Sequence, residues 1–464
     1  MAFLVAGTLR VATQMADTRD SLGRKGKYDV RGPKAALMLI SPGVVAAAVT
    51  ALEDVFQALG FESWERRQVP VQGFLEKLAW FRERLDAHRH PVGCALVALV
   101  APRGQLKQPQ QLVRELSGCG ALRGCPKVFL LLSSGPGSAL ESGAFLAGLR
   151  ELCGRFPHWS LVQLLTELAP GPNTQYDLSK TRAALLLAVI QGRPGAQHDV
   201  EALGGLCRAL GFETTVRTDP TAQAFQEELA QFQKQLDTCR GPVSCVLVAL
   251  MAHGGPQGQL LGADRQEVQP EALMQELSRC RVLWGRPKVF LLQACRGGNR
   301  DAGVGPTALP WYWSWLRAPP SVPSHADVLQ IYAEAQGPLG NGNFFPCWSL
   351  KRTLESASSN SFSEVTVGSS CRGAPPGRSD QADILTVYSA AEGYVAYRDD
   401  KGSDFIQTLV EVLRANPGRD LLELLTEVNR RMCEQDVLGP DCDELRKACL
   451  EIRSSLRRRL CLQP

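Results

Sequence analysis

Two side chains of this sequence, Cys295 and His253, could together perform nucleophilic catalysis. Cys295 follows the apolar run 288–292 and the pair Gln293-Ala294, and His253 follows the apolar run 243–252. An imidazole can hold or restore a thiolate and later pass a proton to a leaving amine. Each residue alone has a plainer interpretation, a buried structural cysteine and a satisfied core histidine, so the case depends on their position.

Both apolar runs are typical of buried strands, and neighbouring parallel strands lie about 5 Å apart. Ligands in open α/β sheets bind at the carboxyl ends of the strands, which is where both residues fall. The surrounding sequence alternates strands with helices: 182–190 predicts a strand, and Phe225, Leu229, Phe232 and Leu236 follow the spacing of one helical face. This alternation predicts a mostly parallel sheet covered on both faces.

The motif Gln293-Ala294-Cys295-Arg296-Gly297, with Ala252-His253-Gly254 upstream, resembles the active-site signature of the caspase family. The resemblance implies an α/β fold, a three-layer sandwich with a mostly parallel six-stranded sheet and helices on both faces. It also implies a cysteine endopeptidase that cleaves after aspartate through a thioester, with Cys295 as nucleophile and His253 as general acid/base. The backbone N–H groups of Gly254 and Cys295 would stabilise the oxyanion, one such donor being worth about 3 kcal/mol.

Three further positions match the residues with which caspases hold the aspartate side chain: Arg193, Gln293 and Arg398. Guanidinium groups suit a carboxylate because they are planar and permanently charged. A single arginine is usually a solvated surface residue, but these three occur together at the expected strand ends and loop. This sequence has Val395 and Asp404 at two positions where an aromatic residue is common in the family. The preference for substrate residues upstream of the aspartate therefore stays open, and weak catalysis is compatible with these changes.

The composition gives no indication of nucleic acid, a membrane, a metal or a cofactor as a partner. The net charge of +4 is small for 464 residues, which gives no reason to expect nucleic acid or an anionic membrane, and no apolar run has the length of a membrane span. The pair His88 and His90 has no ligand at metal-binding spacing, so we expect no metal and no cofactor. Fifteen scattered cysteines without a C-x-x-C pair favour a reducing compartment, the cytoplasm or the nucleus.

The sequence repeats itself. Pro126-Lys-Val-Phe-Leu-Leu131 recurs as Pro287-Lys-Val-Phe-Leu-Leu292, and Ala58-Leu-Gly-Phe-Glu62 recurs as Ala209-Leu-Gly-Phe-Glu213. On this alignment the first copy has Pro102, Ser134 and Leu132 where the second has His253, Cys295 and Gln293. We therefore predict these domains: a mobile leader 1–26, a smaller degenerate caspase-like repeat 27–170, a large-subunit-like region 174–302, a largely disordered linker 303–381 and a small-subunit-like region 382–464.

A third repeat lies inside the predicted linker, where 326–337 resembles 382–393. We expect the later copy to supply the sheet strand and the earlier one to remain a loop, and we expect 455–462 to form the final strand. Caspases are activated by cleavage after aspartate in the linker, and the candidates are Asp301 first, then Asp380 and Asp383.

Protein substrates with aspartate at the cleaved position are the expected partners, with other caspases or a second copy of the chain as further ones. One alternative is a weak or inactive regulator that binds other caspases or their activators. Another is that the first copy serves as a built-in partner of the second. The first copy shows no counterpart of the final strand, which in caspases forms the dimer edge, and this argues against the built-in partner.

Overall fold

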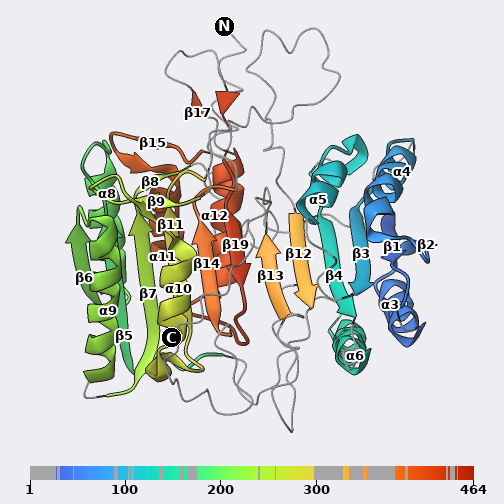
Figure 1. Ribbon diagram of the computed structural model, residues 1–464, viewed down its shortest axis with the longest axis horizontal. Helices are drawn as coiled ribbons and strands as arrows, with labels where there is room; N and C mark the ends of the chain where they lie inside the picture. Colours follow the sequence, from blue (N-terminus) through green and yellow to red (C-terminus); the bar gives the residue numbers. More distant parts are fainter. Residues whose placement is uncertain are drawn as a thin grey trace, which may run out of the picture.

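The computed structural model of the protein describes residues 32–156, 175–296, 328–333, 348–352 and 382–463, with short gaps inside the longer ranges, and isolated residues at 28, 161 and 164. Its central feature is a sheet of twelve strands in the order β2-β1-β3-β4-β12-β13-β19-β14-β11-β7-β5-β6 (Figure 1). Half of these strands come from the part of the chain that carries Cys295.

The half with Cys295 has six strands, of which the first five in the order β6-β5-β7-β11-β14-β19 are parallel and β19 is antiparallel. Their bounds are β5 Thr181–Ala188, β6 Phe212–Thr218, β7 Val243–Met251, β11 Lys288–Gln293, β14 Ile384–Tyr388 and β19 Glu451–Ser454. All nine residues of β7 are buried, as a central parallel strand covered on both faces requires. The predicted mostly parallel six-stranded sheet is confirmed.

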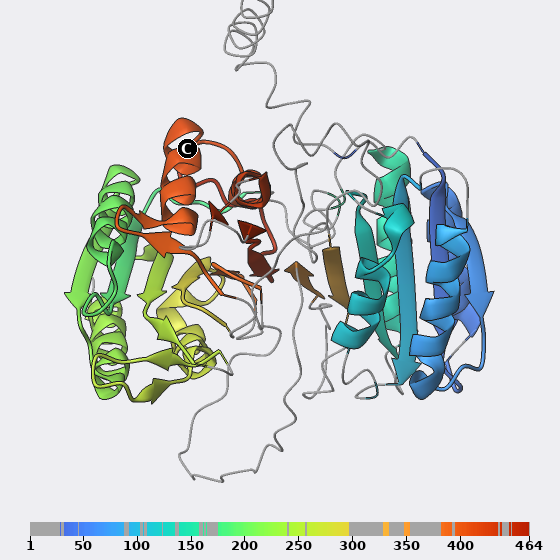
Figure 2. The ribbon, with the colours of Figure 1, turned by 90° about the horizontal axis from the view of Figure 1, so that it is seen from above.

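Helices cover both faces of this half-sheet (Figure 2). On one face α8, α11 and α12 share a core with side chains of the strands, and on the other α9 and α10 form a second core. Their bounds are α8 Ala196–Ala209, α9 Ala222–Thr238, α10 Pro270–Ser278, α11 Asp404–Ala415 and α12 Leu421–Glu434. The four predicted core residues of α9 are all buried, so three layers form because each helix buries one apolar stripe.

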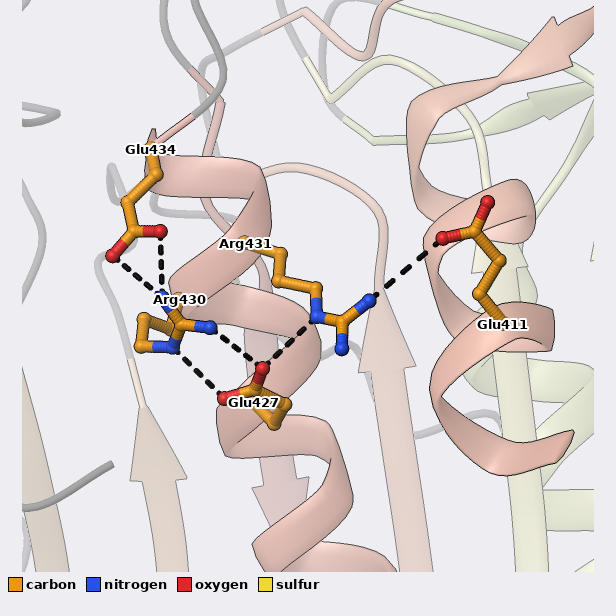
Figure 3. Close-up of polar contacts among 5 residues, drawn as sticks. All are labelled: Glu411, Glu427, Arg430, Arg431 and Glu434. Atoms are coloured by element: carbon orange, nitrogen blue, oxygen red, sulfur yellow. Dashed lines mark hydrogen bonds and ion pairs between the residues drawn. The ribbon is translucent and has the colours of Figure 1, made fainter. Parts of the chain in front are cut away.

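Helix α12 also carries a cluster of charged side chains on its exposed surface (Figure 3). Glu427 accepts hydrogen bonds from Arg430 at 2.7 Å and from Arg431 at 2.9 Å, one turn further along the helix. Arg431 also lies 3.8 Å from Glu411 of α11. Pairs at this spacing add a few tenths of a kcal/mol each, so the packing of α11 on α12 depends mainly on the apolar core.

The other half contributes β1, β2, β3 and β4, which are parallel, in the order β2-β1-β3-β4. The bounds are β1 Lys34–Ile40, β2 Glu62–Arg66, β3 Cys94–Pro102 and β4 Lys127–Ser134. The helices are α3 Ala46–Ala58, α4 Phe74–Asp86, α5 Pro109–Ser117 and α6 Ala139–Arg155. Here too there are two cores: one is formed with α3 and α6, the other with α4 and α5.

Short elements complete the described chain. They are the 3₁₀ turns η1 Val71–Gly73, η2 Gly120–Leu122 and η3 Arg281–Leu283, and the strands β8 His253–Gly254, β9 Leu260–Leu261, β10 Glu267–Val268, β15 Arg398–Asp399, β16 Gly402–Ser403, β17 Val437–Leu438 and β18 Leu445–Arg446. Two of the short sheets, β10-β9-β8 and β15-β16, contain predicted site residues.

The structure corrects two expectations about the sheet. The segment 326–337, expected to be a loop, contains strand β12 Val328–Ala333, and the predicted linker 303–381 also contains β13 Trp348–Arg352. An apolar run beside the open edge of β4 pairs with it because unpaired backbone groups at an edge need partners. The expectation of a final strand at 455–462 is also wrong, since β19 ends at Ser454 and only single bridges follow.

Candidate active site

Cys295 and His253 leave neighbouring strands at the same edge of the sheet. Strand β11 pairs with β7 in parallel, and Gln293 lies opposite Met251. The backbone N–H of Ala252 donates to the carbonyl of Gln293 at 3.2 Å, so the two strands end together. Each of the two residues follows its strand by two positions, and the sequence-based prediction of adjacent strands with coincident ends agrees with this pairing.

Gly254 lies directly against the backbone of Cys295. A Cβ atom placed on Gly254 would be 1.7 Å from the Cys295 carbonyl oxygen, far inside van der Waals contact. Only glycine allows this approach, which brings the main chain of the histidine strand next to the main chain of the cysteine. The Cys295 thiol itself is partly exposed and donates to the carbonyl of Ala396 at 3.7 Å.

The imidazole of His253 is exposed at this edge, and its environment favours the neutral form. Partial desolvation lowers the pKa of His253 from its ordinary value, and the positive charges of Arg193 and Arg398 lower it further. A hydrogen bond to the Gly192 backbone opposes the shift. The influence of both arginines on the ring shows that the guanidinium groups lie near the histidine.

Arg193 is buried beside the end of β11. Its Nη1 donates to the carbonyl of Val189 at 2.6 Å and its Nη2 to the carbonyl of Gln293 at 3.4 Å. Among the described residues, no carboxylate bonds the side chain and its buried Nε has no partner. Burial, followed by the charge of Arg398, lowers the pKa of Arg193 to about 10. A buried guanidinium that donates to neutral carbonyl groups is positioned to bind an anion.

Gln293 and Arg398 lie in the same region. The Gln293 side chain is 2% exposed and its Oε1 has no partner within the described part of the chain. Arg398 begins β15, and burial lowers its pKa, while negative charge on Asp199 and Cys295 would raise it. Arg193 donates to the Gln293 carbonyl, and the Cys295 thiol donates to the carbonyl of Ala396, two residues before Arg398, so the structure brings all six predicted site residues to one end of the sheet.

Sequence reasoning missed Asp199, a carboxylate at the start of α8 that is 1% exposed. Its Oδ1 accepts from the backbone N–H of Ser403 at 2.8 Å and from Nε2 of Gln407 at 3.2 Å, while its Oδ2 has no partner among described residues. Burial raises the pKa of Asp199. Through these hydrogen bonds Asp199 connects α8 to the hairpin that carries Arg398. The sequence signal that could have identified Asp199 is its position in the first helical turn after Arg193.

Asp404, which departs from the family pattern, occupies the first turn of α11 behind the N-cap Ser403. Burial raises the pKa of Asp404 to about 6, and the charges of Asp399 and Asp199 act in the same direction. A negative charge at a helix N-terminus is otherwise favourable. The position therefore introduces a second carboxyl group close to the hairpin that bears Arg398.

Asp383 is not an accessible cleavage site in this structure. It is 1% exposed, accepts from the Tyr176 hydroxyl at 2.6 Å and forms an ion pair with Arg457 at 2.7 Å. A protease needs an extended, exposed segment, so this candidate for processing is wrong for the folded protein. Asp301 and Asp380, like the leader, Gly297 and the His88 and His90 pair, lie outside the described residues.

The described residues also bear on metal binding and on membrane insertion. Within them, no three or more histidine, cysteine, aspartate or glutamate side chains are arranged to hold a metal ion. None of their helices is long and apolar enough to cross a membrane.

Comparison with known proteins identifies the family. The family model described as the caspase domain matches residues 181–460. Caspase-14 of Homo sapiens is 37% identical over 292 residues, which span 62% of this chain and 96% of the relative, and caspase-14 of Mus musculus is 36% identical over 302 residues, 64% of this chain and 98% of the relative. The solved structure of caspase-1 from Spodoptera frugiperda aligns with a TM-score of 0.44 at 21% identity, covering 63% of this chain and 95% of that one. The chain belongs to the caspase family of cysteine proteases.

Proposed function

We propose that the half of the chain containing Cys295 is an endopeptidase that hydrolyses peptide bonds after aspartate. Cys295 is the nucleophile, His253 is the general acid/base, and the N–H groups of Gly254 and Cys295 receive the oxyanion. Arg193, Gln293 and Arg398 bind the aspartate side chain of the substrate. Family membership and the shared position of these groups at one sheet edge support the proposal.

One observation carries the specificity for aspartate: Arg193 is buried beside the thiol, and its Nε is a hydrogen-bond donor that lacks a partner in the described structure. Leaving such groups unsatisfied costs free energy, and a ligand that bonds them recovers it. A carboxylate fits best because it accepts several charge-assisted hydrogen bonds from guanidinium groups. It would also reduce the repulsion between Arg193 and Arg398 that contributes to the low pKa of Arg193.

The reaction follows from these positions. His253, held neutral by its lowered pKa, takes the Cys295 proton as the sulfur attacks the scissile carbonyl carbon. The carbonyl electrons move to the oxygen, which lies against the two N–H donors. When the intermediate collapses, the C–N bond breaks and His253 protonates the leaving amine. Water, deprotonated by His253, then hydrolyses the thioester and restores the thiol.

Labelling with a peptide electrophile tests this proposal. A peptide that ends in an aspartyl chloromethyl ketone should add once to the protein, with the adduct mapped to Cys295 by peptide mass analysis. Cys295→Ala should abolish the adduct, and His253→Ala should slow its formation by at least 100-fold. Cys280→Ala, which removes a partly buried thiol elsewhere, is the matched control and should label normally. No Cys295 adduct on the wild-type protein, intact or cut within the 353–381 segment, would reject the proposal.

A catalytically weak regulator is the second candidate, and the carboxylates near the arginines favour it. The charge of Asp199 acts on both Arg193 and Arg398, so the chain itself supplies part of the negative charge that a substrate would bring. Such a protein would bind another caspase without cleaving peptides. The regulator is indicated if wild-type protein and Cys295→Ala capture a purified caspase equally while neither forms an adduct. Failure of both to capture one would rule it out.

A further inference from the structure

The two halves of the sheet have equivalent strands in equivalent register. Lys34 lies opposite Cys94 in one half, and the repeat-related Arg182 lies opposite Cys245 in the other. The same holds one strand further: Ala95 pairs with Lys127 where Val246 pairs with Lys288. At the outer edges, Ala35 faces Glu62 as Ala183 faces Glu213. The sequence duplication therefore extends to how the backbones pair.

Strand β12 extends this equivalence into the segment between the halves. It pairs with β4 in parallel, and Val328 lies opposite Lys127. In the other half β14 pairs with β11 in parallel, and Ile384 lies opposite Lys288. Val328 matches Ile384 in the repeat of 326–337 and 382–393, and Lys127 matches Lys288 in the repeat of Lys-Val-Phe-Leu-Leu. Hence β12 takes the place in the first half that β14 takes in the second.

Strand β13 is the counterpart of β19. Lys351 lies opposite Gln330 of β12, and Arg453 lies opposite Thr386 of β14. Gln330 and Thr386 are the same position of the repeat, so Lys351 and Arg453 are equivalent. This supplies the final strand whose absence counted against a built-in partner in the sequence.

The two final strands meet in a self-complementary way. Strands β13 and β19 are antiparallel, and the equivalent residues Lys351 and Arg453 lie opposite each other. The flanking pairs, Leu350 with Ser454 and Arg352 with Ile452, exchange equivalent positions on either side. A contact in which position i meets j and j meets i is the pattern of a two-fold interface between two copies of one fold. Here both copies belong to one chain.

We propose that the first half, completed by β12 and β13, is a second copy of the fold that acts as the built-in partner of the half with Cys295. Antiparallel pairing with β13 satisfies the edge of β19, which would otherwise be open to another strand. Tethering gives β13 an effective concentration on the order of 1 mM at that edge, so a second chain at micromolar concentration competes poorly. The partner has no catalytic pair of its own, because Pro102 and Ser134 lie in register at the positions equivalent to His253 and Cys295.

The register predicts a disulfide that tests the proposal in the full-length chain. In the double variant Lys351→Cys/Arg453→Cys, the new thiols lie opposite each other on paired antiparallel strands, where Cα atoms are about 4.5–5.5 Å apart, within reach of a disulfide. Mild oxidation should link the peptides that contain positions 351 and 453, and the product should run as a monomer on a non-reducing gel. Lys351→Cys/Arg459→Cys is the matched control, since Arg459 lies beyond the end of β19, and should not link.

Sedimentation of the wild-type protein provides a measurement that needs no substitution. The chain should remain a particle of 50.5 kDa across micromolar concentrations. A particle of twice that mass, or a 351–453 link found between chains rather than within one, would overturn the proposal. Equal cross-linking of the test and control pairs would also overturn it. None of these results depends on whether Cys295 is catalytic.

Discussion

The guanidinium of Arg296, the residue after Cys295, forms an ion pair with the carboxylate of Glu451 on β19 at 2.5 Å. Arg296 is 7% exposed and Glu451 is fully buried, and the guanidinium also lies 3.9 Å from the centre of the Tyr388 ring. This pair joins the segment that carries Cys295 to the strand at the junction of the two halves. The end of β11 and the junction are therefore not structurally independent.

Replacing Glu451 by glutamine should destabilise the protein by about 3 kcal/mol, because the buried guanidinium of Arg296 loses the carboxylate charge it faces, and Arg453, which bonds the same carboxylate at 2.8 Å, loses it too. Chemical denaturation measures the change in the free energy of unfolding. The rate of Cys295 labelling reports whether the end of β11 is also disturbed. Glu434→Gln is the control, since Glu434 pairs with Arg430 on the surface of α12 (Figure 3) and should cost at most about 0.5 kcal/mol. Equal effects of the two substitutions would contradict a structural role for the buried pair.

The pKa of His253 should lie below the ordinary value of 6.5 and should rise when Arg398 is replaced by glutamine. The sign follows from charge: a nearby cation disfavours the imidazolium, so its removal makes protonation easier. NMR titration of the imidazole in the Cys295→Ala background measures this, with the resonance assigned by loss in His253→Gln. Arg458→Gln, outside the site, should leave the titration unchanged. A fall or no change in the pKa with Arg398→Gln would be inconsistent with the structure.

Asp404→Asn should stabilise the protein at neutral and alkaline pH. The folded pKa of about 6 exceeds the unfolded value of 3.8, so the carboxyl contributes stability below pH 3.8 that is lost as the pH rises through about 6. Allowing for solvent screening of this partly exposed group, the gain at pH 8 should be about 1 kcal/mol.

Urea denaturation of wild-type protein and Asp404→Asn across pH 4 to 8 checks this prediction. The advantage of the variant should narrow steadily as the pH falls below about 6. Asp400→Asn, which changes an exposed carboxyl group in the neighbouring β15–β16 hairpin, is the matched control. A benefit of Asp404→Asn that is the same at every pH would show that ionisation of Asp404 is not its source.

Gly254→Ala should abolish most of the reactivity of Cys295, because the new Cβ would clash with the Cys295 carbonyl at 1.7 Å and push the two main chains apart. Loss of one oxyanion donor typically costs 100-fold or more, which sets the expected fall in the labelling rate. Gly241→Ala is the control, since a Cβ there meets nothing within 4 Å. A labelling rate for Gly254→Ala within about threefold of wild type would mean that this close approach is unimportant.

Strongly patterned segments could be predicted from the sequence, and weakly patterned ones could not. Residue type and spacing alone predict burial for two segments: the wholly apolar run of β7, and the helical stripe of α9 formed by Phe225, Leu229, Phe232 and Leu236. Strand β13 has only five residues in a Pro-, Gly- and Ser-rich region, and it forms because the edge of β19 is available. A comparison of Cys347 to Arg352 with Cys449 to Ser454 would have revealed it, since cysteine, a branched apolar residue and a basic residue recur at equivalent positions.

The candidate site shows the same division. The spacing of Gln293 and Cys295 placed both at a strand end, because strand geometry is local. Asp199 was missed because its importance comes from burial against Ser403 and Gln407, more than two hundred positions later in the chain. Long-range contacts of a single polar side chain leave no periodic trace in the sequence.

Peptide cleavage tests the central claim most directly. A library with every residue at the cleaved position should be cut by the wild-type protein after aspartate, with the asparagine analogue slower by at least 100-fold because it lacks the charge that Arg193 and Arg398 bind. Cys295→Ala should cut nothing, and Arg193→Gln should lose most of the discrimination between aspartate and asparagine. Cleavage that survives Cys295→Ala, or that ignores the residue at the cleaved position, would contradict the account.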